Sequence, residues 1–226
     1  MDDLRKHWTQ QQAELRKALS SAAHFTAGLA LFMEQYAVMH TAGLSGGRFW
    51  SLHDEALAGL SEAHFRHCPH PELNSIAWLV WHSTRIEDMT MNYLVLEQPQ
   101  VLLASDWTPR LGVALRDCGA GMDETEVRAF SAQVSLEGLT AYRCAVGAQI
   151  YAGVQRLQAA QLKEIVPTER VNALCAEGSI HQKAGWLAEF YTHRSKGFFL
   201  TRTATSHNFL HLNQAARLRE KLRKTA

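Results

Sequence analysis

Two histidines, His207 and His211, have the residue type and spacing to bind a metal ion in this 226-residue chain. They lie in the stretch 203–218, TATSHNFLHLNQAARL, which is predicted to be helical. Because four residues make about one helical turn, both imidazoles project from the same face. Neutral imidazole is a common metal ligand, although two hydrogen-bonded core histidines are the alternative. We expect this face to be buried, because apolar residues fall on or beside it: Leu200, Ala204, Leu210, Ala215, Leu218 and Leu222.

A third histidine, His82, lies on the inward face of a different predicted helix. It shares that face with Trp78, Leu79, Ile86 and Met89. Three histidines from two helices can converge in a core, and zinc and similar ions accept such a set while keeping a position open for water or substrate. We therefore predict one divalent metal ion per chain, zinc or nickel, with His82, His207 and His211 as its ligands.

Four further residues are candidates for the surroundings of this site. Trp78, one turn before His82, could form a wall, and Gln214 could hydrogen-bond a ligand imidazole or a bound water. Arg85 could anchor an anionic substrate. Glu87 points about 140° away from His82, so it is a candidate base or outer partner rather than a direct ligand. The alternatives are core packing for Trp78 and a solvated or interhelical ion pair for the two charged residues.

The elements that must position these side chains are predicted to be helices. Apolar residues recur with a period near 3.6, and strand-like alternation is almost absent. Ser61, Asn74 or Ser75, and Asp123 are predicted helix N-caps. The long helices are expected near residues 10–40, 75–96, 135–165 and 199–223. The pattern predicts an all-α single domain over residues 1–226, a four-helix bundle with additional short helices in the connections.

Composition excludes several classes of protein. The chain carries 23 Lys and Arg against 22 Asp and Glu, and the basic stretch 217–224 is typical of a helix C-terminus, so we expect no nucleic-acid partner. The four cysteines are widely spaced, which favours a reducing compartment. A polar N-terminus and the lack of any apolar run near roughly 18 residues argue against a signal peptide or a membrane span. We expect a soluble, cytoplasmic protein.

Other metal and catalytic patterns are weak or missing. The sequence has no Glu-x-x-His or His-Glu-x-x-His motif, which argues against di-iron proteins and common metalloproteases. The cluster His64, His67, Cys68 and His70 lies where a helix meets a proline loop, and we expect a solvated loop there. The remaining histidines are expected at the surface or at helix caps: His7, His24, His40, His53, His181 and His193.

The strings NSIAWLVWHSTRIED and SHNFLHLNQAARLREKL resemble the DinB/YfiT-like superfamily. The segment 59–75 is similar to that family's entry into its second main helix. The resemblance implies a helical bundle with one divalent metal held by three histidines, here His82, His207 and His211, with Gln214 at the family's trailing glutamine. Leu212 and Asn213 depart from the residues that many members carry there, so the subfamily and its substrate stay open.

The resemblance also implies an activity. Several branches of the family use a low-molecular-weight thiol, such as bacillithiol or mycothiol, in transferases and isomerases. We therefore expect a metal-dependent S-transferase or isomerase that acts on a small molecule. A metal-dependent hydrolase and a non-catalytic metal-binding or stress-response bundle are the alternatives. A homodimer is left open.

Overall fold

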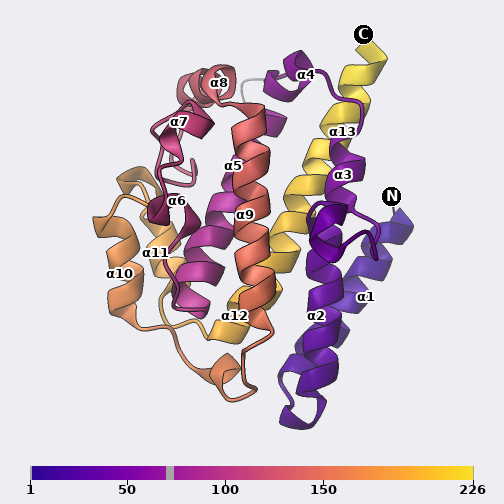
Figure 1. The fold of residues 1–226 in the computed structure, drawn as a ribbon, viewed down its shortest axis with the longest axis vertical. Helices are drawn as coiled ribbons and strands as arrows, with labels where there is room; N and C mark the ends of the chain where they lie inside the picture. Colours follow the sequence, from indigo (N-terminus) through magenta and orange to yellow (C-terminus); the bar gives the residue numbers. More distant parts are fainter. Residues whose placement is uncertain (1, 70–73, 226) are drawn as a thin grey trace.

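The computed structural model describes residues 2–69 and 74–225, and every regular element in these ranges is helical (Figure 1). The nearest approach to a sheet is an isolated bridge between Ile165 and Ser195. The predicted all-α class is confirmed.

Four long helices form the bundle that holds the candidate site. They are α2 (Phe25–Met39), α5 (Ile76–Glu87), α9 (Leu136–Val154) and α13 (Asn208–Thr225). Figure 1 shows α2 and α13 running in one direction and α5 and α9 in the other. Two of these helices have π-helical neighbours: η3 (Asp88–Val95) continues α5, while α12 (Lys196–Thr201) and η6 (Arg202–His207) lead into α13.

Short helices fill the connections, as the sequence predicted. Ser61 caps α4, Ser75 caps α5, and Asp123 forms a reciprocal capping box with Glu126 at the start of α8. These caps satisfy backbone N–H groups that have no partner in the first turn. The connecting elements are η1 (Ala22–His24), η2 (Ala42–Ser45), α3 (Leu52–Leu57), α4 (Glu62–Arg66), α6 (Val101–Ala104), α7 (Thr108–Leu111), α8 (Glu124–Gln133), η4 (Gln161–Lys163), α10 (Thr168–Ala176), η5 (Gln182–Ala184) and α11 (Trp186–Tyr191).

The single long helix predicted over residues 10–40 is wrong. The chain forms α1 (Asp2–Leu19), turns at Ser20 and Ser21, and returns alongside as α2. Ser21 is extended, and the Ser20 hydroxyl donates to the Lys17 carbonyl, which ends α1. Gly28 permits the close return, because a Cβ there would lie 3.0 Å from the Ala18 Cβ.

One other helix boundary and the burial of one residue differ from the sequence prediction. Helix α9 ends at Val154 rather than near residue 165, because the chain turns through residues 155–160 before η4. Leu210, which was expected on the buried face of the last helix, is 51% exposed. The other apolar residues expected on that face are buried, namely Leu200, Ala204, Ala215, Leu218 and Leu222.

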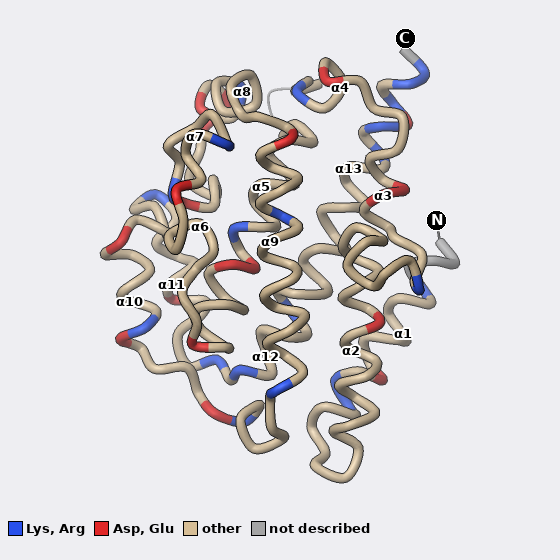
Figure 2. The backbone as a smooth tube through the Cα atoms, viewed as in Figure 1, with Lys and Arg blue, Asp and Glu red and all other residues tan. Residues whose placement is uncertain are grey.

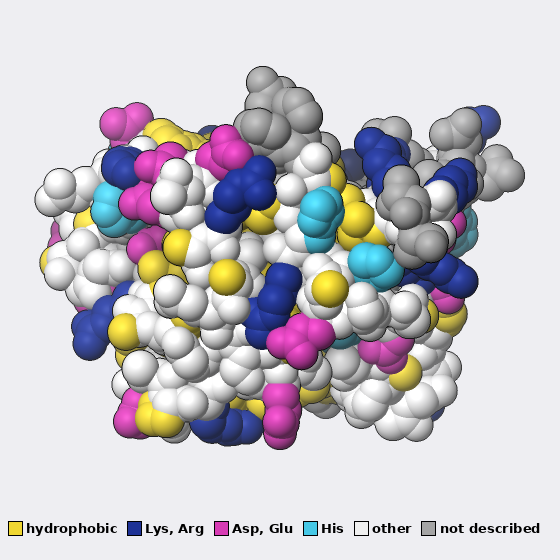
Figure 3. Space-filling view, turned by 90° about the horizontal axis from the view of Figure 1, so that it is seen from above, with side chains coloured by type: hydrophobic (Ala, Val, Ile, Leu, Met, Phe, Trp, Pro, Cys, Tyr) yellow, Lys and Arg dark blue, Asp and Glu magenta, His cyan; other side chains and the backbone are white. Residues whose placement is uncertain are grey.

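Charge of both signs is spread over most elements (Figure 2). The end of the bundle seen in Figure 3 carries acidic, basic and histidine side chains side by side. None of the helices in residues 2–69 and 74–225 is long and apolar enough to cross a membrane.

Candidate metal centre

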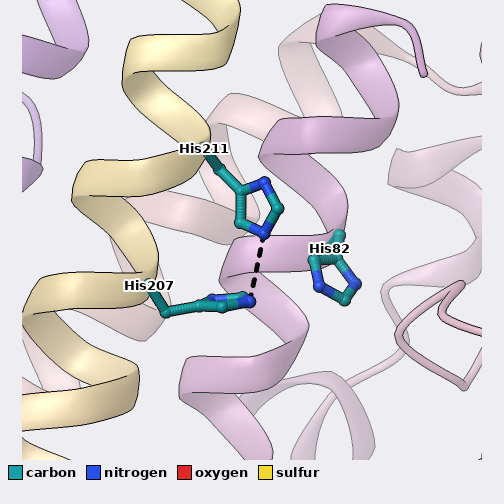
Figure 4. Close-up of side chains that lie close together, drawn as sticks. All are labelled: His82, His207 and His211. Atoms are coloured by element: carbon teal, nitrogen blue, oxygen red, sulfur yellow. Dashed lines mark hydrogen bonds between the residues drawn. The ribbon is translucent and has the colours of Figure 1, made fainter. Parts of the chain in front are cut away.

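The structure brings the three predicted histidines together at the interface of α5 with η6 and α13 (Figure 4). One ring nitrogen from each of His82, His207 and His211 lies within 4.8 Å of the other two. The Nε2 atoms of His207 and His211 are 3.1 Å apart. Two nitrogens on one tetrahedral zinc are about 3.4 Å apart when each Zn–N bond is about 2.1 Å. In the described part of the chain, this is the sole group of three or more His, Cys, Asp or Glu with such spacing.

Hydrogen bonds to the far ring nitrogen fix the orientation of two of the three imidazoles. His82 Nδ1 donates to the Cys118 carbonyl at 2.8 Å, and His211 Nδ1 donates to Gln214 Oε1 at 2.7 Å. In each neutral ring, the lone pair therefore lies on Nε2, which is the form a metal requires. His207 Nδ1 is buried and has no partner within the described residues.

Burial keeps these imidazoles neutral. Desolvation is the largest cause of a lowered pKa in all three. The neighbouring imidazoles also lower the pKa of His82 and His207, and the pKa of His82 falls to about 3. His207 and His211 are partly exposed while His82 is buried, so the centre has a solvent side and a core side.

Trp78 forms an aromatic wall of the centre. Its indole stacks on His82, with ring centroids 4.5 Å apart and planes 6° from parallel, and it meets His211 edge-on at 6.4 Å. Gly119 lies against the same indole, where a Cβ would be 2.7 Å from Trp78 Nε1. Gly119 also has a φ of +75°, which favours glycine.

The loop of residues 116–118 is held on α5 by three side-chain donors of that helix. Trp81 Nε1 donates to the Asp117 carbonyl, His82 Nδ1 to Cys118, and Arg85 Nε to Arg116. The loop therefore fixes the orientation of the His82 ring. Burial raises the pKa of the Cys118 thiol to about 11, so this thiol stays protonated near neutral pH.

Arg85 holds protein groups together instead of facing a ligand. It is fully buried, and its two NH groups donate to Asp88, Tyr142, Gln100 and Ser179. Arg85 was expected either to anchor an anionic substrate or to form an ion pair between helices. The buried network agrees with the second of these expectations.

Glu87 belongs to a second buried network, on α2, α5 and α9. Its carboxylate lies 3.2 Å from His40 Nε2 and 3.7 Å from Arg143. Arg143 also donates to Asn208 Oδ1, next to the ligand position His207. His40 is the C-cap residue of α2, as the predicted cap position allows, although it is buried. A surface or cap position is wrong for His53, which lies inside α3 and is 5% exposed.

The π-helical turn η6 sets the direction of His207. Thr205 and Ser206 donate their hydroxyls to carbonyls five residues earlier, Leu200 and Thr201, and thereby support the wide turn. Thr203 in η6 accepts a hydrogen bond from Thr90 in η3 at 2.8 Å, so the two π-helical segments contact each other. Such wide turns are frequent at functional sites.

The sequence did not reveal the Cys118 carbonyl, the loop that carries it, or the π-helical turns. The one sequence signal in this loop is Gly119, which predicts a turn. His64 lies in the short helix α4, and His67 is exposed. Neither histidine belongs to a group that could hold a metal ion among the described residues. His70 lies outside the described residues.

The comparisons with known proteins agree with this fold. The family model of the DinB superfamily matches residues 47–215. The chain belongs to the DinB superfamily, which confirms the family indicated by the sequence motifs. A conserved protein from Enterococcus faecalis has a similar crystal structure: the TM-score is 0.60 at 18% identity, with 84% of this chain and 94% of that chain covered. That likeness concerns the fold alone. None of the curated proteins matches this chain.

Proposed function

We propose that His82, His207 and His211 bind one divalent metal ion, zinc or nickel, through Nε2. The convergence of three nitrogen donors, two of them oriented by hydrogen bonds to Cys118 and Gln214, carries the proposal. The donor set fits the group, because neutral imidazoles are borderline ligands that such ions accept. Gln214 and the Cys118 carbonyl act as the outer partners that raise the basicity of the ligand rings.

We propose further that the protein is a metal-dependent S-transferase or isomerase that uses a low-molecular-weight thiol. A bound divalent ion lowers the pKa of a coordinated thiol or water and so supplies a nucleophile near neutral pH. Trp78 and the loop at Cys118 close the core side of the centre. The electrophile therefore approaches from the side of His207 and His211, which are partly exposed.

Elemental analysis of the purified protein tests the metal centre. We expect about one divalent ion per chain in the wild type and almost none in His207→Ala. His67→Ala is the matched control, because His67 is an exposed histidine outside the site, and this variant keeps its metal. Equal metal content in the wild type and His207→Ala would remove the proposal.

A thiol-transfer assay tests the reaction. A panel of thiols is offered with an alkyl chloride, so that a C–S bond forms, chloride leaves and the thiol proton passes to solvent. We expect the metal-loaded wild type to accelerate the reaction over the EDTA-treated protein and over His207→Ala. Acceleration of ester hydrolysis alone would favour the hydrolase, and no acceleration of either reaction would favour a non-catalytic metal-binding bundle.

A further inference from the structure

A cavity of about 420 Å³ lies between α1 and the segment formed by η6 and α13. This volume is within the range of small-molecule sites, which runs from about 300 to 1,000 Å³. Helix α1 supplies Trp8, Thr9, Gln12 and Arg16, and the C-terminal segment supplies the facing wall. Helix α1 precedes the residues 47–215 matched by the family model, so this wall lies outside the matched region.

The cavity is positively charged. Arg16, Arg202 and Arg217 line it, each from a different element, and none of its lining residues is an Asp or Glu. The ion pairs formed among the described residues involve other side chains, so these three guanidinium groups have no carboxylate partner there. Three like charges around one cavity repel each other, and a bound anion would remove that cost.

Contacts between side chains tie the walls of the cavity together. Trp8 from α1 stacks on Phe209 from α13, with ring centroids 4.4 Å apart and planes 7° from parallel. Gln12 donates to Gln35 at 2.5 Å and accepts a hydrogen bond from Ser206 at 2.9 Å, which ties α1 to α2 and to η6. A site held in shape before binding loses little entropy when its ligand enters.

We propose that this cavity binds a small organic anion with a carboxylate or phosphate group. Arg16, Arg202 and Arg217 would pair with the anionic group, because guanidinium matches the geometry of both groups in two-point contacts. The apolar part of the ligand would pack on Trp8 and Phe209. The small volume and the overall charge of +1 favour a small molecule over a nucleic-acid strand or an anionic membrane.

The anion site adjoins the metal centre. Gln214 lines the cavity, and its Oε1 accepts the hydrogen bond from His211 Nδ1. Ser206 lines the cavity next to His207 in the chain. None of the three histidines lines the cavity itself, so Gln214 is the side chain that connects the two sites. Anion binding depends on the arginines and not on the metal. A test of the anion site is therefore independent of the function proposed above.

Calorimetric titration of the EDTA-treated full chain tests the proposal. The probes are succinate, inorganic phosphate and neutral succinamide. We expect saturable binding of at least one anion and none of succinamide, and the stronger anion identifies carboxylate or phosphate as the preferred group. In Arg202→Gln/Arg217→Gln the Kd should rise at least tenfold. Arg223→Gln is the matched control, because Arg223 is exposed on α13 outside the cavity and its loss leaves the Kd unchanged.

Several results would overturn the proposal. They are no saturable binding of either anion to the wild type, an equal Kd in the double variant with its circular dichroism unchanged, or an equal loss in Arg223→Gln. Binding only to a long polyanion such as heparin would also overturn it, because it would point to a charged surface instead of a cavity.

Discussion

At the scale of single residues, the centre depends on which ring nitrogen each histidine leaves free. His82 and His211 each donate a hydrogen bond from Nδ1 to a carbonyl-type oxygen, so Nε2 faces the centre. One of these oxygens belongs to a side chain three residues further along α13, which the sequence could indicate from spacing alone. The other belongs to the backbone of Cys118, far away in the chain, and no residue type marks it.

Gln214→Ala should weaken metal binding without removing it. The loss of the Gln214 Oε1 acceptor frees the His211 ring to rotate and lowers its basicity, so we expect a fall in affinity of about 10-fold to 100-fold. Competition with a chromophoric chelator measures the change. Gln133→Ala, which removes an exposed glutamine on α8, is the control. An unchanged affinity in Gln214→Ala would show that the hydrogen bond to His211 does not support the centre.

At the scale of elements, periodicity predicted the helices because each buries one apolar face. It could not predict the turn at Ser20 and Ser21, since the apolar period continues on both sides of it. The π-helical turn before His207 was also missed. It depends on hydroxyls that bond to carbonyls five residues earlier and on the contact of Thr203 with Thr90, which only tertiary structure provides.

Gly119→Ala should disturb both stability and the metal centre. Alanine at a positive φ costs about 1–2 kcal/mol, and its Cβ would also meet the Trp78 indole that stacks on His82. Gly178→Ala is a close control, because Gly178 has a φ of +82° with open space around it. Urea unfolding and metal titration should show a loss of stability in both variants and a loss of metal affinity in Gly119→Ala alone. An equal metal affinity in the two variants would show that the loop at Gly119 does not support the metal centre.

At the scale of the whole molecule, a metal ion at the proposed centre would tie α5 to the η6 and α13 segment. These elements also pack through the large apolar core, so the bundle does not need the ion to fold. Saturation at 1,000 times the Kd would add about 4 kcal/mol to the free energy of unfolding. We expect zinc to raise the midpoint of thermal unfolding in the wild type and to leave it unchanged in His207→Ala. An equal rise in both proteins would place the bound ion elsewhere.

Acid should destabilise the metal-free protein through its buried histidines. Desolvation lowers the pKa of His53 to about 4 and also lowers the pKa of His40, where Glu87 opposes the shift in part. As the pH falls below about 6.5, these histidines become protonated in the unfolded chain but stay neutral in the folded chain. The free energy of unfolding therefore decreases until the pH reaches the pKa of the histidine in the folded chain. Each such histidine contributes up to about 1.4 kcal/mol per pH unit in that window.

Urea unfolding in EDTA between pH 7.5 and pH 5 measures this slope. The free energy of unfolding should fall as the pH is lowered. It should fall less steeply in His53→Gln, because this variant lacks one buried histidine that stays neutral in the folded chain. The exposed His67 provides the comparison, and His67→Ala should keep the slope of the wild type. If the free energy of unfolding of the wild type were constant over this range, the buried histidines would be exchanging protons with solvent as freely in the folded chain as in the unfolded one.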